Sequence, residues 1–215
     1  MFPVYKSIYG IANAEYIIKK SRFIVTLAQV DTEEKGQTQI QSCKKQYYDA
    51  RHNCFAYCIG SDRKYQRSSD DGEPSGTAGK PILEVLKQHQ LTNTVAIVTR
   101  YFGGIKLGAA GLIRAYSHTV SLGIENATIA TYAPFEIANI TLTYPYIGIV
   151  EQYCIDNKIP IRERIFTDKV TFSLQISINQ VNILRKNLQN ITAGTLTYNC
   201  QEIQYLPTLQ APPHR

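Results

Sequence analysis

The sequence contains no tryptophan and a single methionine, and its five cysteines are scattered without a metal-binding or disulfide pattern. No Cys-x-x-Cys pair occurs, so the sequence predicts no structural zinc site of the common kind. An odd number of dispersed cysteines, together with an N-terminal stretch unlike a secretory leader, is typical of reduced thiols and predicts a cytoplasmic protein. No run of 18 apolar residues is present, so we expect no membrane-spanning segment and no membrane partner.

Recognisable catalytic motifs are also missing. None of the four histidines stands in a catalytic motif, and the G-x-S-x-G nucleophile motif is absent. The segment at residues 74–81 has a superficial likeness to a nucleotide-binding P-loop, but Pro81 stands where that loop needs serine or threonine, and Pro74 stands where it needs glycine. We therefore expect no catalytic residues, no bound metal and no cofactor.

The net charge of +6 is unevenly placed along the chain. Residues 1–134 contain 16 basic and 11 acidic residues, and the basic ones cluster at 19–22, 44–45 and 63–67. Basic clusters suit RNA or the ribosome, because neutralising phosphates drives such binding. Solvated lysines also keep many proteins soluble, so charge alone leaves both interpretations open.

The most informative stretch runs from residue 68 to residue 117. Residues 95–98, Val-Ala-Ile-Val, form an apolar run typical of a strand covered on both faces. A loop containing glycine and followed by a helical pattern lies on each side of this strand. We expect the two loops to meet in space and to form one recognition surface.

The loop after the strand is the better candidate for binding a ligand. A helix that begins just after Gly103 and Gly104 exposes free backbone N–H groups, which favour anions. Alternatively, this loop is a tight turn packed under a neighbouring helix, with Arg100 paired to Asp71. The predicted nucleic-acid or phosphate-binding residues are Arg100, Tyr101, Gly103, Gly104, Lys106, Arg114 and Lys80.

The loop before the strand is acidic, with Asp70, Asp71 and Glu73 close together. These carboxylates would hold magnesium in an enzyme, but in turns such residues are more often solvated or capping, and we favour that interpretation. Cys54 and Cys58 share a predicted strand face near His52, and small buried thiols are favoured there over a metal pair.

Periodicity places the remaining elements. Strands at 5–11 and 14–20 are expected to pair with each other, with Asn13 near the turn between them. Further strands are expected at 23–28, 53–59, 64–69 and from 129 onward, and helices at 31–48, 79–90 and 107–126. Asp31, followed by Glu34, is the expected start of the first helix. This order predicts an α+β domain with helices over a mixed sheet.

A second unit is expected to begin near Ala133 and Pro134. Its elements follow the order βαββαβ, which is the ferredoxin-like pattern. The predicted domains are therefore residues 1–133 and 134–206, with a loose tail at 207–215.

Two long motifs, DDGEPSGTAGKP and VTRYFGGIKLGAAGLIRAYS, resemble the signature of the IMPACT/YigZ family, and KKSRFIV (residues 19–25) and ARHNCFAY (residues 50–57) fit it in the same order. One departure is Ala110, where another glycine is expected. The resemblance implies a bacterial two-domain member of the family. Its N-terminal domain would be ribosomal-protein-S5-domain-2-like, as is domain IV of elongation factor G. Its C-terminal domain would be ferredoxin-like and similar to domain V of that factor.

The resemblance implies a function in translation. We expect a non-catalytic regulator of translation or of a stress response that binds RNA or the ribosome through the basic, glycine-rich loop surface. One alternative is an enzyme acting on a phosphorylated small molecule or nucleotide, with a metal held by the acidic loop. Another is a protein-interaction module that uses the same surface.

Overall fold

The computed structural model describes residues 2–209 and divides into two compact units, made up chiefly of Pro3–Tyr132 and of Ala133–Leu206. Both combine helices with β-sheet, so the predicted α+β class is confirmed. Each unit has a hydrophobic core of its own. Among the described residues, no helix is both long and apolar enough to cross a membrane.

The first unit is built on a five-stranded sheet with the order β2-β3-β6-β4-β5. Every neighbouring pair in it is antiparallel, so the predicted mixed sheet is wrong. The physical reason is that β6 lies between β3 and β4 and runs opposite to both. The strands are β2 (Ile11–Ile18), β3 (Ser21–Gln29), β4 (His52–Ile59), β5 (Tyr65–Ser69) and β6 (Thr94–Tyr101).

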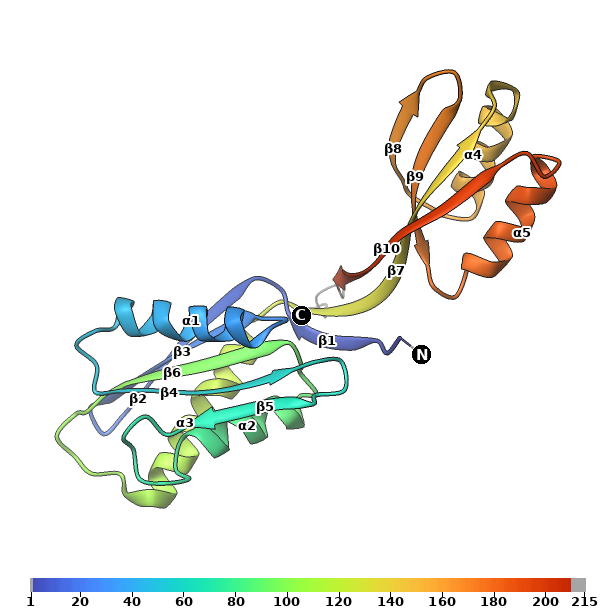
Figure 1. Cartoon of the computed structure of the whole chain (residues 1–215). Coiled ribbons are helices and arrows are strands. Elements are labelled where there is room, and N and C mark those ends of the chain that lie inside the picture. Colours follow the sequence, from blue (N-terminus) through green and yellow to red (C-terminus); the bar gives the residue numbers. More distant parts are fainter. Residues whose placement is uncertain (1, 210–215) are drawn as a thin grey trace. The chain divides into compact units, whose positions relative to one another are not determined.

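Helices cover both faces of this sheet (Figure 1). The helix α1 (Glu33–Gln46) lies on one face, and α2 (Gly79–Gln88) and α3 (Gly108–Glu125) lie on the other. The central strand β6 alternates between the two cores, because Val95 and Ile97 belong to the α1 side and their neighbours to the α2–α3 side. The prediction of a strand covered on both faces is confirmed.

The N-terminal strands pair differently from the prediction. The strand β1 (Tyr5–Ile8) pairs with the distant β7, whereas β2 pairs with β3. Asn13 lies within β2, not at a turn, and its side chain accepts a hydrogen bond from Thr26. The first helix is capped by Thr32, whose hydroxyl accepts a hydrogen bond from a backbone N–H of the first turn, whereas Asp31 forms an ion pair with a lysine of that turn.

A tight two-residue turn joins β2 and β3. Ile18 pairs with Ser21, and Lys19 and Lys20 between them both have positive φ angles, 45° and 63°. Turns of this shape usually contain asparagine and glycine, because left-handed backbone is unfavourable for other residues. Two exposed lysines therefore stand at the tip of the hairpin in a conformation that costs free energy.

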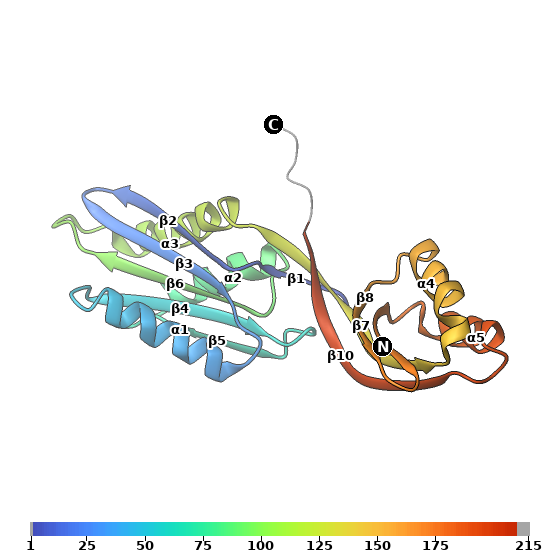
Figure 2. The ribbon, with the colours of Figure 1, turned by 90° about the horizontal axis from the view of Figure 1, so that it is seen from above.

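The second unit has the expected βαββαβ order. Its strands form a sheet with the order β10-β7-β9-β8, with α4 and α5 on one face (Figure 2). The helices pack there through Val150 and Cys154 of α4 and Leu184 and Leu188 of α5. The elements are β7 (Ile129–Leu142), η1 (Tyr144–Tyr146), α4 (Ile147–Asp156), β8 (Ile161–Phe166), β9 (Val170–Ser177), α5 (Val181–Ile191) and β10 (Thr197–Leu209).

Two details of this region differ from the prediction. The strand β7 is continuous through Pro134, which lies between the segment paired with β1 and the segment paired with β9. Proline has no backbone N–H group, so it is tolerated in a strand at a position where no N–H hydrogen bond to a neighbouring strand is needed. The strand β10 extends to Leu209, so residues 207–209 of the predicted tail are strand, and residues 210–215 lie outside the described part.

Candidate nucleic-acid interface

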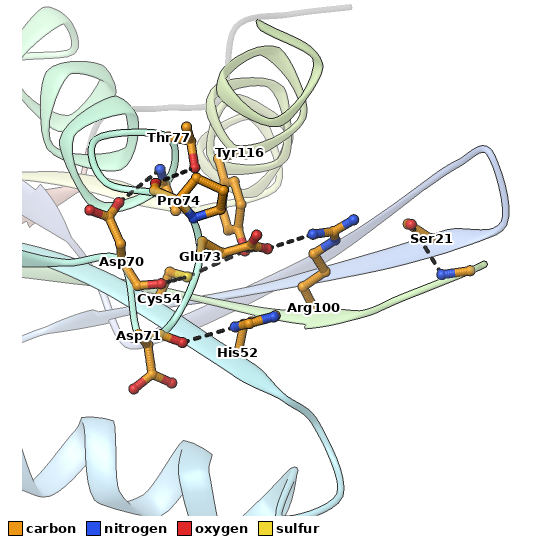
Figure 3. Close-up of polar contacts among 12 residues, drawn as sticks. Ser21, His52, Cys54, Asp70, Asp71, Glu73, Pro74, Thr77, Arg100 and Tyr116 are labelled. Atoms are coloured by element: carbon orange, nitrogen blue, oxygen red, sulfur yellow. Dashed lines mark hydrogen bonds and ion pairs between the residues drawn. The ribbon is translucent and has the colours of Figure 1, made fainter. Parts of the chain in front are cut away.

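A buried ion pair joins the acidic loop before β6 to Arg100, which lies near the end of that strand. The Glu73 carboxylate accepts a hydrogen bond from Arg100 Nη1 at 2.7 Å and another from the Tyr116 hydroxyl at 2.8 Å. Figure 3 shows Glu73 and Arg100 pointing toward each other. The partner of Arg100 is thus Glu73 and not Asp71, the residue that the alternative interpretation named. Residues of the acidic loop and of the loop after β6 line one pocket, described below, so the two loops lie close together.

Asp70 organises the acidic loop. Its carboxylate accepts hydrogen bonds from the backbone N–H groups of Gly76, Ala78 and Gly79 at 2.8–3.0 Å. Partial burial acts to raise the pKa of this carboxyl, but the three N–H donors outweigh it and hold the pKa below its ordinary value. Asp70 therefore joins the loop to the beginning of α2.

Asp71 has a different set of partners. Its carboxylate pairs with Lys44 Nζ at 2.8 Å and accepts from the backbone N–H of Asn53, also at 2.8 Å. Its carbonyl oxygen lies 2.9 Å from Nδ1 of His52 (Figure 3). The three acidic side chains thus bind protein groups in separate places, and no cluster of metal-binding side chains occurs within residues 2–209.

The cysteines of β4 are buried structural thiols. Cys54 donates to the carbonyl oxygen of Asp70 at 2.9 Å, and burial raises the pKa of its thiol to about 12. Cys54 and Cys58 both belong to the core beneath α2 and α3. Both thiols are free and buried, as expected for small core side chains.

Arg100 is held between aromatic rings. Its guanidinium carbon lies 5.3 Å from the ring centre of Phe23 and 5.6 Å from that of Phe102. The residue is only 5% exposed. Its Nε atom is buried and has no hydrogen-bond partner among the described residues. Arg100 is therefore mainly a packing residue that ties the acidic loop to β6.

Gly103 lets the loop after β6 pack closely against the backbone of the β2–β3 turn. A Cβ atom added there would lie 2.0 Å from the backbone carbon of Lys20, and the Gly103 N–H donates to the Ser21 hydroxyl at 3.2 Å. The turn thus packs under the β2–β3 hairpin and not under a helix. Gly104, by contrast, has a φ of +83° and open space around it.

Five basic side chains around the beginning of α3 are exposed and lack an ion-pair partner among the described residues. No side chain caps this end of the helix. Its free N–H groups and dipole add positive potential at the same place. The set, here called the α3 cations, consists of Lys19, Lys20, Arg51, Lys106 and Arg114.

Two hollows lie beside this helix. The α3 groove, about 700 Å³, runs between β2, α2 and α3 and is lined by Lys19, Arg114, Tyr16 and His118, among others. The Arg51 pocket, about 390 Å³, is lined by residues that include Arg51, Arg100 and Lys106. Leu107 borders both, so the two hollows adjoin at the start of α3.

The predicted site residues are only partly brought together. Arg100 and Lys106 line the Arg51 pocket, and Arg114 lines the α3 groove. Tyr101 donates its hydroxyl to Asp49 at 2.8 Å. Lys80 is exposed in the first turn of α2 and borders neither hollow.

The prediction of site residues missed Lys19, Lys20 and Arg51. All three lie in motifs that carried the family resemblance, KKSRFIV and ARHNCFAY. That signal existed in the sequence, but only the fold places these distant motifs beside α3. Ala110, the departure from the expected glycine, is exposed in the first turn of α3.

Comparisons with known proteins agree with the motifs. A family model described as the Impact N-terminal domain matches residues 19–124. The IMPACT family member YvyE of Bacillus subtilis is 39% identical over 206 residues, covering 96% of this chain and 95% of that protein. The IMPACT family member YigZ of Escherichia coli is 38% identical over 136 residues, which are 62% of this chain and 67% of that protein.

More distant similarity extends to a eukaryotic protein and to a solved structure. The Protein IMPACT homolog of Dictyostelium discoideum is 38% identical over 110 residues, which are 48% of this chain and 29% of that protein. A crystal structure of a hypothetical protein matches with a TM-score of 0.65 and 29% identity, covering 94% of this chain and 99% of that one. The full-length similarity to YvyE, together with the domain match, shows that this chain belongs to the IMPACT family.

Proposed function

We propose that this protein is a non-catalytic factor that binds RNA, free or in the ribosome, and thereby regulates translation or a stress response in the cytoplasm. The observation that carries the proposal is the set of exposed, unpaired α3 cations around an uncapped helix end. The role in translation or a stress response is inferred from the family resemblance, and RNA is inferred as the ligand from the chemistry of this surface.

Charge and shape support RNA as the ligand. Side chains that are already paired gain little from a new anion, but the α3 cations are free to neutralise phosphates. The α3 groove provides a path between Lys19 and Arg114. Phe102, which is 48% exposed, provides an aromatic surface for stacking a base.

The assignment of each unit to a known fold is part of the same proposal. We infer that the first unit is ribosomal-protein-S5-domain-2-like and that the second is ferredoxin-like and similar to domain V of elongation factor G. The βαββαβ order and the strand order β10-β7-β9-β8 support the second assignment. Similarity to two domains of a translocation factor favours ribosome contact by analogy.

The enzyme alternative has no comparable support. Its metal-binding residues would be Asp70, Asp71 and Glu73, but each carboxylate already has protein partners. Asp70 accepts hydrogen bonds from three backbone N–H groups. Asp71 binds a lysine and a backbone N–H, and Glu73 binds an arginine and a tyrosine. Releasing any one of them for a metal would break bonds that hold the loop.

Salt-dependent RNA binding tests the proposal. The protein should bind a 12-nucleotide single-stranded RNA of mixed sequence, with affinity falling steeply between about 50 and 200 mM salt. The double variant Lys106→Ala/Arg114→Ala should bind about tenfold or more weakly, with a salt slope smaller by about 1.4 if each side chain contacts one phosphate. Fluorescence anisotropy measures both quantities.

The matched control is Lys45→Ala/Lys64→Ala, which removes the same charge from exposed positions outside the α3 cations. It should leave affinity within about twofold of wild type. Salt-insensitive binding, or equal losses in the two double variants, would overturn the proposed interface. Sedimentation of the same proteins with ribosome fractions then separates free RNA from the ribosome as the partner.

A further inference from the structure

We propose that the Arg51 pocket binds a nucleoside monophosphate, that is, a phosphate monoester next to a base. This group would be either a free nucleotide or the 5′-phosphorylated end of an RNA chain. In the second form, the inference rests on the proposed RNA-binding function and says which part of the RNA is recognised.

The charge of the pocket matches a dianion. Arg51, Arg100 and Lys106 line it, and Glu73 compensates only Arg100, to which it is bonded at 2.7 Å. Arg51 and Lys106 remain without an ion-pair partner among the described residues, so two positive charges are uncompensated. A phosphate monoester carries about −1.5 to −2 at pH 7, whereas an internal phosphodiester of RNA carries one charge.

The beginning of α3 forms part of the wall. Gly108 and Ala109, the first two residues of the helix, line the pocket, and no side chain caps their end of the helix. Free N–H groups and the positive end of a helix dipole bind phosphate oxygens. The helix is 18 residues long, which is ample for an aligned set of peptide dipoles.

A buried donor in the wall provides an independent indication. The Arg100 side chain is only 7% exposed, and its Nε has no hydrogen-bond partner among the described residues. Leaving a buried donor without an acceptor is unfavourable, because the group has lost its hydrogen bonds to water. An anion bound beside Arg100 would supply the acceptor that the Nε–H lacks, after a small adjustment of the arginine side chain.

The remaining wall is apolar and suits a base. Pro74, Phe102, Leu107 and Leu112 line it, and the ring of Phe102 is half exposed. The volume of about 390 Å³ lies within the range of about 300–1,000 Å³ typical of small-ligand sites. A phosphate near Arg51 and a base against Phe102 would use both halves of the pocket.

The experiment compares ligands that differ only in the phosphate. Fluorescence anisotropy is measured with a 12-nucleotide RNA bearing either a 5′-phosphate or a 5′-hydroxyl, and AMP and adenosine are used as competitors. We expect wild type to prefer the 5′-phosphate about tenfold and to bind AMP but not adenosine. Arg51→Ala should reduce the preference to within twofold and abolish the competition by AMP.

Arg114→Ala is the matched control, because it removes one exposed charge near α3 but outside the pocket. It should weaken both RNAs equally and keep the tenfold ratio. Phe102→Ala should weaken AMP more than inorganic phosphate, because it removes the surface for the base. Thermal unfolding confirms that each variant is folded.

The outcomes distinguish the inference from the proposed function. If both RNAs bind equally with steep salt dependence and AMP does not compete, the pocket inference is wrong and RNA binding stands. If neither RNA binds but AMP binds in an Arg51-dependent manner, measured by calorimetry, the pocket binds a free nucleotide and the RNA proposal falls. Competition by adenosine equal to that by AMP would also overturn the inference.

Discussion

Arg100 shows how a residue that looks like a phosphate ligand serves the fold. Its guanidinium is buried between two rings and paired with Glu73, which also accepts the Tyr116 hydroxyl. Removing one partner of such a pair leaves the other charge buried and uncompensated, which is costly. The exposed neighbours Lys106 and Arg114 are therefore the better residues for testing ligand binding.

We predict that Arg100→Ala lowers the free energy of unfolding by about 3–5 kcal/mol, because the Glu73 carboxylate loses its counter-charge. Urea denaturation followed by circular dichroism measures the change. Lys106→Ala is the control and should change stability by less than about 0.5 kcal/mol, since Lys106 is exposed. An Arg100→Ala protein as stable as wild type would show that the ion pair contributes nothing to folding.

Asp70 makes stability depend on pH in the acid range. Three backbone N–H donors hold the pKa of its carboxyl below the ordinary value, despite the opposing effect of burial. A group whose pKa is lowered in the folded state stabilises the protein above its unfolded pKa, about 3.9 for aspartate. This stabilisation is lost as the pH falls through the folded pKa.

We predict that Asp70→Asn lowers stability at pH 7 by about 1–2 kcal/mol, comparable to the loss of a helix cap. Below about pH 4 the difference from wild type should shrink, because the wild-type carboxylate becomes protonated. Urea unfolding between about pH 2 and pH 7 provides the measurement. Glu125→Gln, at an exposed position of α3, should leave the pH profile unchanged, and a pH-independent difference for Asp70→Asn would contradict the argument.

At the scale of elements, the β2–β3 hairpin combines strain with charge. Lys19 and Lys20 both have left-handed backbone at the turn, and the hairpin packs against Gly103 of the loop before α3. Asparagine and glycine would adopt this turn at lower cost. The two lysines occupy this turn at a cost in stability, which is consistent with a role in binding.

We predict that Lys19→Asn/Lys20→Gly stabilises the protein by about 1 kcal/mol and weakens RNA binding. Thermal unfolding and RNA anisotropy measure the two effects. Lys19→Gln/Lys20→Gln removes the same charge without relieving the backbone, so it should weaken RNA binding without the gain in stability. If both double variants keep wild-type affinity, the hairpin is not part of the interface.

Element types were easier to predict than element partners. The apolar run of β6 and the helical spacing of α2 and α3 are local patterns, and each was found near its predicted position. The pairing of β1 with β7 joins residues more than 120 positions apart. No local pattern records such a contact, which is why β1 and β2 were wrongly expected to pair.

At the scale of the molecule, the two units have separate cores. The core of the second unit includes Phe172 and Leu174, both fully buried, and none of its residues belongs to the cores of the first unit. Hydrophobic cores that share no residues can lose their structure at different free energies.

We predict that Phe172→Ala destabilises residues 133–206 by about 3–5 kcal/mol, because a fully buried ring is lost. Amide hydrogen exchange should become faster there, while residues 3–132 keep their protection. The reciprocal variant, Leu27→Ala in the first unit, should show the opposite pattern. Equal loss of protection in both units after Phe172→Ala would mean that they unfold as one.

The sequence by itself determined the family, the α+β class and the types of most elements, because motifs and hydrophobic periods are local properties of the chain. It also pointed to Lys106 and Arg114, which lie in the loop and the helix that follow β6 along the chain. Only the tertiary structure decided that Glu73 is the partner of Arg100 and that Lys19 and Arg51 lie near the beginning of α3. Those neighbours come from separate strands and loops, and their proximity depends on strand order and register, which no local pattern encodes.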